Sequence, residues 1–186
     1  MKKGKFIVIS GPSGVGKGTI CNKLINELNA WYSVSTTTRS PRYGEVEGVN
    51  YYFVSKEEFE KRIKNGDFLE YNVYNENYYG TSKENVLKKL NDGVNVFSEI
   101  DVNGAHNIKK ICPDSLLIYI APPNMEALRE RLIGRGTETI DKIEARLKIA
   151  EKEMQEIDFY DYVVINDDIE RATNEVRNII LNDIKK

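Results

Sequence analysis

The stretch Gly11-Pro12-Ser13-Gly14-Val15-Gly16-Lys17-Gly18-Thr19 is the part of the sequence that decides the fold. Directly before it, residues 6–10 (FIVIS) form a short apolar run that is typical of a buried parallel strand. Directly after it, apolar residues recur at helical spacing from Ile20 to Leu28, which predicts an amphipathic helix. A strand, a glycine-rich loop, a lysine and a helix, in this order, are the context of a phosphate-binding loop (P-loop).

The chemistry of this loop suits a nucleoside triphosphate. Glycines allow backbone N–H groups to turn inward around phosphate oxygens, and the N-terminus of the following helix adds a partial positive charge. The side chain of Lys17 can reach the β- and γ-phosphates. We therefore predict that ATP is bound by Gly11, Pro12, Ser13, Gly14, Val15, Gly16, Lys17, Gly18 and Thr19.

The same stretch allows two other interpretations. The first is an ordinary glycine-rich turn before a helix, which the strand, lysine and helix around it disfavour. The second is a dinucleotide-binding turn, which requires Gly-x-Gly-x-x-Gly and an acidic residue about 20 positions later. The glycines here are spaced differently, and the later region reads Thr36-Thr37-Thr38-Arg39 instead. A nucleoside triphosphate site therefore remains the preferred interpretation.

The composition is that of one soluble globular domain. The chain has 186 residues, of which 40% are hydrophobic and 30% are charged. A formal net charge of −2 gives no overall basic field, so we expect neither nucleic acid nor a membrane as a partner. Cys21 and Cys112 have no metal-binding or redox spacing, and the apolar run near the start is too short for a signal peptide or a membrane span. A cytoplasmic protein is expected.

Strands alternate with helices along the predicted chain, which indicates an α/β fold with a parallel sheet flanked by helices. A second strand is expected within residues 30–38. Further strands are expected over 94–97, 115–120 and 161–165, and helices over 81–90, 124–132, 140–154 and 169–184. The carboxyl end of the 94–97 strand leads into Glu99 and Asp101, which should therefore lie beside the crevice where such sheets bind ligands.

Residues 50–79 are unusually rich in tyrosine and differ from the rest of the chain. Strands are expected over 51–54 and 68–71. Between them, Ser55 and Glu58 form a capping box that begins a short helix, and Gly66 marks its end. The pattern predicts a small mixed α/β insertion.

Several motifs together make the sequence similar to the guanylate kinase family. They occur in the family's order, over nearly the whole chain, as residues 11–17 (GPSGVGK), 35–42 (STTTRSPR), 44–46 (GEV), 77–80 (NYYG), 131–139 (RLIGRGTET) and 164–168 (VINDD). The resemblance implies a P-loop kinase core with a GMP-binding insertion and a helical lid. The single domain would divide into a core (1–34, 81–125 and 151–186), the insertion (35–80) and the lid (126–150).

The resemblance implies ATP-dependent phosphorylation of GMP, and of dGMP, to the diphosphate in purine nucleotide metabolism. The GMP-binding positions that it implies are Ser35, Arg39, Arg42, Tyr51, Glu70, Tyr79, Thr81 and Asp101. Their chemistry agrees, because a carboxylate such as Glu70 can accept from N1–H and N2–H₂ of guanine, whereas adenine offers an acceptor at N1. Arginines and tyrosine hydroxyls suit the phosphate. Each tyrosine has packing within the insertion as its alternative role.

Catalysis in this family needs positioning and charge neutralisation rather than a general base, since the nucleophile is a phosphate oxygen. The catalytic positions implied are Lys17, Arg39, Arg131, Arg135 and Arg146. The alternative for Arg131, Arg135 and Arg146 is a role as surface arginines on helices. Asn166 and Asp167 are implied to lie near the adenine of ATP, with capping of the last helix as the alternative.

Magnesium bound with ATP is the expected cofactor. Gly18 stands where a Ser or Thr usually ligates the ion, so the metal is expected to be held through water, by Thr19, Glu99 and Asp101, and by the nucleotide. His106, the only histidine, receives no role.

Two rival functions are compatible with a P-loop kinase core. One is a kinase acting on AMP or dephospho-coenzyme A, which Glu70, Ser35 and Thr81 disfavour. The other is a peptide-binding module like the guanylate kinase-like domains of scaffold proteins, which the retained Lys17 and lid arginines disfavour. ATP and GMP are the expected partners, and the sequence leaves the oligomeric state undecided.

Overall fold

A computed structural model gives the structure of residues 3–74, 76–134, 136 and 139–185. Its central sheet has five parallel strands in the order β2-β7-β1-β8-β9. These strands are β1 (Phe6–Ser10), β2 (Trp31–Tyr32), β7 (Val96–Glu99), β8 (Leu116–Ala121) and β9 (Tyr162–Ile165). The parallel sheet flanked by helices that the sequence predicts is confirmed.

Alternation along β1 explains the two layers around the sheet. Ile7 and Ile9 pack into one hydrophobic cluster, whereas Phe6 and Val8 pack into another on the opposite face. The first cluster is closed by α1 (Lys17–Glu27), α5 (Met125–Gly134), α6 (Ile140–Glu153) and α7 (Ile169–Ile184). The second is closed by α3 (Lys83–Asn91), α4 (Val102–Ile111) and the 3₁₀ helix η1 (Met154–Phe159).

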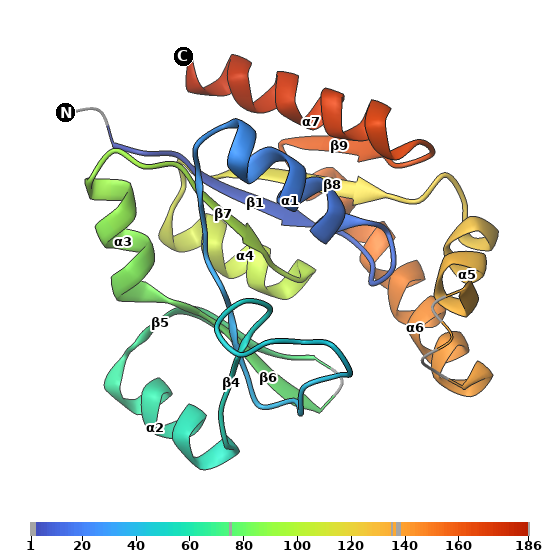
Figure 1. The fold of residues 1–186 in the computed structure, drawn as a ribbon, viewed down its shortest axis with the longest axis horizontal. Coiled ribbons are helices and arrows are strands. Elements are labelled where there is room, and N and C mark those ends of the chain that lie inside the picture. The colour runs from blue at the N-terminus through green and yellow to red at the C-terminus, as the bar shows by residue number, and fades with distance from the viewer. Residues whose placement is uncertain (1–2, 75, 135, 137–138, 186) are drawn as a thin grey trace.

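A second, mixed sheet lies beside this core (Figure 1). Its strand order is β4-β3-β6-β5, formed by β3 (Thr36–Thr37), β4 (Tyr52–Phe53), β5 (Phe68–Tyr74) and β6 (Asn77–Ser82). Helix α2 (Lys56–Asn65) begins where predicted, since Ser55 Oγ accepts a 3.2 Å hydrogen bond from the backbone N–H of Glu58. Figure 1 shows α5 and α6 projecting on the other side of the P-loop from this sheet.

Two sequence predictions need correction, and one helix has no counterpart among the predictions. The single strand predicted within 30–38 is wrong: β2 pairs with β7 in the core, whereas β3 pairs with β4 and β6 in the second sheet. The helix predicted from residue 81 begins at Lys83, because the chain before it pairs with β5 as strand β6. Helix α4 was not predicted at all.

The sequence did contain a signal for α4. Asp101 caps this helix by accepting a 2.8 Å hydrogen bond from the N–H of Gly104, and Val102, Ala105 and Ile108 recur three residues apart on its buried face. Asp101 was considered only as a ligand. Elsewhere, α7 spans 169–184 as predicted. Among the helices described, none is long and apolar enough to cross a membrane.

Candidate active site

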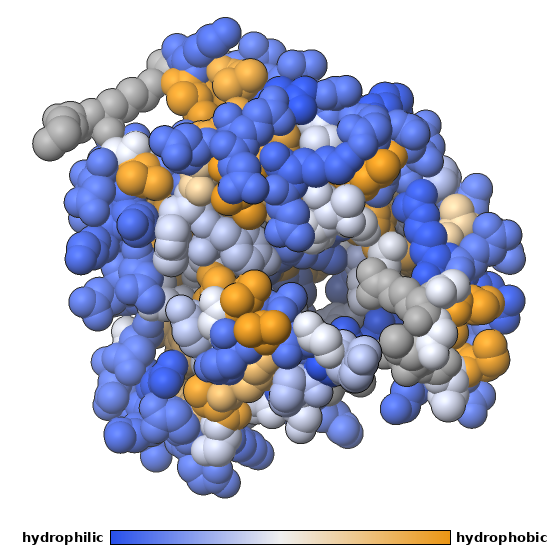
Figure 2. Space-filling model, in the orientation of Figure 1, coloured by the Kyte–Doolittle hydropathy of each residue, from blue (hydrophilic) through white to orange (hydrophobic). Residues whose placement is uncertain are grey.

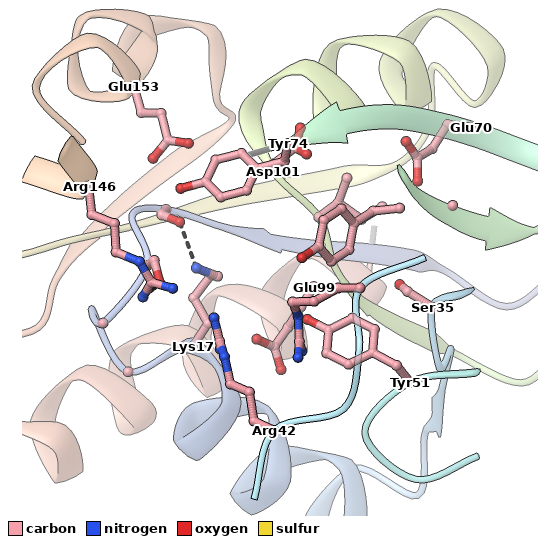
Figure 3. A pocket seen from close by; sticks show the side chains of 18 residues that line it. Lys17, Ser35, Arg42, Tyr51, Glu70, Tyr74, Glu99, Asp101, Arg146 and Glu153 are labelled. Carbon is pink, nitrogen blue, oxygen red and sulfur yellow. Dashed lines mark hydrogen bonds between the residues drawn. The ribbon is translucent and has the colours of Figure 1, made fainter. Parts of the chain in front are cut away.

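A cleft opens at the carboxyl ends of β1 and β7, between the P-loop, the second sheet and α6. Figure 2 shows the surface hollowed between the second sheet and α5–α6, and Figure 3 shows side chains from all three parts pointing into the cleft. The residues that line it are Gly11, Ser13, Gly14, Gly16, Lys17, Ser35, Arg39, Arg42, Tyr51, Glu70, Tyr74, Tyr79, Gly80, Glu99, Ile100, Asp101, Arg146 and Glu153. Most of the predicted site residues are thus brought together.

The P-loop wraps around the ammonium group of Lys17. Its Nζ donates hydrogen bonds of 2.6 Å to the carbonyl oxygen of Gly11 and 3.1 Å to that of Pro12; Figure 3 draws one contact from Lys17 as a dashed line. Gly11 has φ +135°, and a Cβ there would lie 2.2 Å from the carbonyl oxygen of Ile120. The loop can therefore lie directly against strand β8 only because this position is a glycine.

Not every residue of the predicted ATP-binding loop faces the cleft. Val15 is fully buried in the core, and its carbonyl oxygen accepts a 2.7 Å hydrogen bond from Nδ2 of Asn166. Thr19 is exposed on α1 and is not among the residues that line the cleft. At Gly18, by contrast, an added Cβ would lie 3.5 Å from Glu99 Oε1. The position facing Glu99 is therefore Gly18, and the structure does not bring Thr19 to it.

The two predicted acidic residues are held in place by neighbours. Tyr32 donates a 3.0 Å hydrogen bond to Glu99 Oε1, while Asn72 Nδ2 lies 3.1 and 3.2 Å from the two carboxylate oxygens of Asp101. Carboxylate oxygens are the ligands that Mg²⁺ prefers. The described part of the chain contains no group of three His, Cys, Asp or Glu residues that could hold a metal alone. This donor set fits an ion held mainly by phosphate and water.

Glu70 lies at the far end of the cleft, on β5, and is only 7% exposed. Burial raises the pKa of Glu70 to about 7, with a further rise from Asp101, although the hydrogen bond from Thr81 opposes this. Thr81 is itself buried, and its Oγ1 donates a 2.7 Å hydrogen bond to Glu70 Oε1. Thr81 does not line the cleft, whereas Ser35 does.

The phosphate-binding residues predicted in the insertion converge near the middle of the cleft. Arg39 makes a bidentate pair with Glu45, with two N–O distances of 2.9 Å, and its guanidinium lies 5.2 Å from the ring centroid of Tyr51. Glu45 also accepts a 2.7 Å hydrogen bond from the backbone N–H of Arg42. Glu45 was not predicted as a site residue. Its carboxylate binds both the side chain of Arg39 and the backbone of Arg42, and so keeps these two residues close together.

Two tyrosines of the insertion, Tyr51 and Tyr79, both line the cleft and pack against each other. Their rings pack edge to face with centroids 5.9 Å apart. Burial raises the pKa of Tyr51 to about 12, with further rises from Tyr79 and Glu99. The hydroxyl of Tyr51 is therefore a hydrogen-bond donor at neutral pH.

The arginines predicted for the lid lie in different places. Nη1 of Arg146 donates a 3.2 Å hydrogen bond to Ser13 Oγ, so Arg146 touches the P-loop. Nη2 of Arg131 donates a 2.8 Å hydrogen bond to the carbonyl oxygen of Asn166, on the other side of that loop. Arg135 lies outside the described residues. The sequence predicts that Arg131 and Arg135 lie on one helix face, and this stays a prediction because Arg135 is outside the described residues.

Asn166 and Asp167 lie behind the P-loop, in a second pocket that also includes Gly16 and Arg131. The capping role considered for them belongs instead to Asp168, whose Oδ1 accepts a 2.8 Å hydrogen bond from the N–H of Arg171. Asn166 is 4% exposed, and Asp167 pairs with Arg171. Both residues line this pocket, while Asn166 also supports the loop.

Tyr74 and Glu153 line the cleft but were not predicted as site residues. Figure 3 shows the Tyr74 hydroxyl directed toward the side of the cleft that carries Glu153 and Arg146. Burial raises the pKa of Glu153 to about 7; Lys17 lowers it and Asp101 raises it. In the sequence, Glu153 is only one of several charged residues near the end of a helix, so nothing distinguishes it there.

Comparisons with known proteins agree on one family. The family model described as guanylate kinase matches residues 3–183. A guanylate kinase of Clostridium tetani is 49% identical over 180 residues, covering 97% of this chain and 86% of that protein. A guanylate kinase of Clostridioides difficile is 46% identical over 187 residues, covering 100% of this chain and 91% of that protein. The crystal structure of guanylate kinase from Anaplasma phagocytophilum superposes with a TM-score of 0.85 at 36% identity, covering 100% of this chain and 89% of that one.

Proposed function

The chain belongs to the guanylate kinase family, whose reaction is the ATP-dependent phosphorylation of GMP to GDP, and we propose that the cleft described above carries it out. In this proposal, the guanine base binds near Glu70, the GMP phosphate binds among the insertion's arginines and tyrosines, and the triphosphate of ATP binds in the P-loop. dGMP is proposed as a second substrate, since the predicted contacts are to base and phosphate.

One observation carries the proposal: a single cleft joins the P-loop at one end to a buried carboxylate at the other. Lys17 and Glu70 both line this cleft. Arg39 and Arg42, from the insertion, line it as well. A buried carboxyl group selects strongly for a ligand with a matching donor edge, because a mismatched ligand sets an acceptor against the carboxyl oxygens. Guanine has that edge at N1 and N2, and adenine does not.

The reaction needs no protein base. The second pKa of a phosphomonoester is about 6, so the attacking oxygen of GMP is already ionised at neutral pH. That oxygen forms a bond to the γ-phosphorus while the bond to the β,γ-bridging oxygen breaks, and ADP leaves with the bond's electrons. The protein's part is to align the two phosphates and to neutralise the charge on the transferring group.

Lys17 and Arg146 are proposed to neutralise that charge from the P-loop side, and Arg39 from the insertion. Arg146 already contacts Ser13 in the loop. Arg131 contacts the carbonyl oxygen of Asn166, and closure of the lid would have to release this hydrogen bond before Arg131 could reach the phosphates. Arg135 is proposed to act with Arg131. Asn166 and Asp167 are proposed to border the adenine of ATP.

Mg²⁺ is proposed to bind with ATP, held through water by Glu99 and Asp101. When bound with ATP, Mg²⁺ would neutralise part of the charge on the phosphates. The residues fit this role, since both carboxylates line the cleft and each is oriented by a hydrogen-bond donor, Tyr32 or Asn72. A metal contact from Thr19 is not part of this proposal, because Thr19 is exposed and does not line the cleft.

The division of the chain into core, insertion (35–80) and lid (126–150) is proposed as the mechanical basis of the reaction. Closure of the insertion and the lid over both substrates would exclude water, which otherwise would accept the γ-phosphoryl group. A cytoplasmic site of action in purine nucleotide metabolism stays a prediction from the sequence.

A coupled assay with ATP tests the proposed function across GMP, dGMP, AMP, CMP and UMP. GMP should give the highest kcat/KM, with dGMP also phosphorylated and AMP rejected by a factor of roughly 10⁴ or more. Comparable rates with AMP would overturn the guanine assignment. A protein that binds neither ATP nor GMP would instead match the scaffold type of domain.

A further inference from the structure

Gly104 occupies a position where the structure leaves no room for a side chain. It lies in the first turn of α4, and a Cβ added there would be 2.7 Å from Glu70 Oε2 and 2.3 Å from Ile100 Cγ2. Both separations are far shorter than carbon contacts in proteins allow. Helix α4 and the carboxylate of Glu70 therefore approach each other as closely as they do only because residue 104 is a glycine.

Backbone conformation does not explain this glycine. Gly104 lies inside a helix and does not have a positive φ. Glycine inside a helix is less favourable than alanine by about 1 kcal/mol. Glycine is thus unfavourable for helix α4 itself, and what it permits is the close approach of Ile100 and of the Glu70 carboxylate.

The surrounding contacts prevent helix and strand from separating to make room. The N–H of Gly104 donates to Asp101 Oδ1, and the same carboxylate accepts hydrogen bonds from Asn72 on β5. Further along α4, Ala105 and Ile108 are fully buried. The helix is therefore fixed to the strand that carries Glu70.

The other carboxylate oxygen of Glu70 is also held. Thr81 Oγ1 donates a 2.7 Å hydrogen bond to Oε1, so that oxygen is fixed from β6 while Oε2 lies against Gly104. A methyl group at position 104 would push Oε2 away and rotate the carboxylate out of this orientation. A carboxylate accepts two parallel hydrogen bonds only in one orientation relative to the donor edge.

We propose that Gly104 is a positioning residue for guanine recognition: it leaves the space that lets the Glu70 carboxylate face the N1–H and N2–H₂ edge of the base. The inference rests on the proposed function, in which Glu70 binds guanine. It adds a residue on another element that makes no hydrogen bond to the base yet sets the selectivity of the site.

Gly104→Ala tests this in the full-length protein. We expect kcat/KM for GMP to fall about 10- to 100-fold, mainly through a higher KM, with the affinity for ATP unchanged. Inosine monophosphate lacks the 2-amino group, so kcat/KM for this nucleotide should fall much less than kcat/KM for GMP. The preference of the enzyme for GMP over inosine monophosphate should therefore fall at least several-fold. An equal loss for GMP, inosine monophosphate and ATP would indicate general damage and overturn the proposal.

Two further variants separate the causes. Asn103→Ala, at an exposed neighbour in the same turn, is the matched control and should leave the nucleotide preference unchanged. Ile100→Ala, made alone and with Gly104→Ala, removes the second close contact. The loss of preference should persist in this double variant, and recovery there would assign the effect to Ile100 and overturn the proposal.

If Gly104→Ala does not fold, rescue identifies the cause. Recovery of cooperative unfolding on adding Glu70→Ala supports the close approach to Glu70, whereas recovery only with Ile100→Ala, or with neither, overturns it. Glu70→Gln distinguishes failure of this inference from failure of the proposed function. If Glu70→Gln loses the preference for GMP and Gly104→Ala keeps it, the positioning role of Gly104 is wrong while the guanine site stands. If both variants keep the preference, the guanine site itself is wrong.

Discussion

The hydroxyl of Tyr32 donates a 3.0 Å hydrogen bond to Oε1 of Glu99, although the two residues are 67 positions apart in the sequence. Burial and the nearby Glu99 carboxylate raise the pKa of Tyr32, so its hydroxyl stays protonated and can only donate to that oxygen. Tyr32 lies on edge strand β2, and Glu99 ends β7. The edge strand of the core sheet thus orients the carboxylate proposed to face hydrated Mg²⁺.

Tyr32→Phe should therefore weaken the response to magnesium. A residue that orients a metal-binding carboxylate typically accounts for about 10- to 100-fold in metal affinity or activity, and we expect the lower end because the carboxylate itself remains. The measurement is the Mg²⁺ concentration for half-maximal activity, together with direct binding of Mg²⁺–nucleotide to the protein. Tyr162→Phe, at an exposed position on the opposite edge strand β9, is the matched control. An unchanged magnesium requirement in Tyr32→Phe would contradict this role.

Lys17→Ala should leave a folded protein with very low turnover. The ammonium group neutralises charge that grows during transfer, an effect comparable to an oxyanion-hole donor at about 2.7–4 kcal/mol, or roughly 10²–10³-fold in kcat. Single-turnover rates and the melting temperature should be measured together. Near-normal turnover would remove the P-loop from the mechanism.

Glu70→Gln should lower kcat/KM for GMP by roughly 10²–10³-fold. One acceptor of a charged hydrogen bond, a bond that contributes about 1.5–3 kcal/mol, is replaced by an NH₂ group that faces guanine's own donors. ATP affinity should hardly change, because the P-loop is at the opposite end of the cleft. Loss of GMP and ATP binding together would point to misfolding, and loss of neither would remove Glu70 from the site.

Stability without ligands should depend on pH through Glu70. Its pKa rises from an ordinary 4.5 to about 7 on folding, so the folded state binds more protons between these values. The stabilisation is complete below pH 4.5 and is lost as the pH rises through 7. Urea unfolding at pH 5 and 8 should show the wild type losing stability relative to Glu70→Gln as the pH rises. The pKa of Glu153 is also raised, but Glu153 is present in both proteins, so its effect cancels when wild type and Glu70→Gln are compared. If the two proteins differed in unfolding free energy by the same amount at both pH values, the raised pKa of Glu70 would be contradicted.

Binding of both substrates should close the insertion and the lid over the cleft. Spectroscopic labels placed in α2 and α6 should move closer when a two-substrate analogue binds, and ATP alone should give a smaller change. Exposed Lys61 in the insertion and exposed Lys142 in the lid are suitable positions, because the labels would then lie away from the cleft. An unchanged distance with the analogue would argue against closure.

Local chemistry determined the part of this protein that the sequence could predict. The P-loop requires only nine consecutive residues between a strand and a helix, and its phosphate-binding groups are backbone groups of that same segment. The cap at Ser55 and the final helix over 169–184 are also local, and both were predicted correctly. The parallel sheet followed from the alternation of strands and helices.

The tertiary structure alone decided how distant residues meet. Residues 30–38 look like one strand, but their two halves pair with different sheets, since the partner strands come later in the chain. Thr81 was predicted among the GMP-binding positions, and the register of β5 and β6 places its hydroxyl on Glu70. The close approach of Gly104 to Glu70 depends on how α4 packs on β5. Residue propensities act over a few positions, whereas such contacts are set by strand register and helix packing, so only the folded chain reveals them.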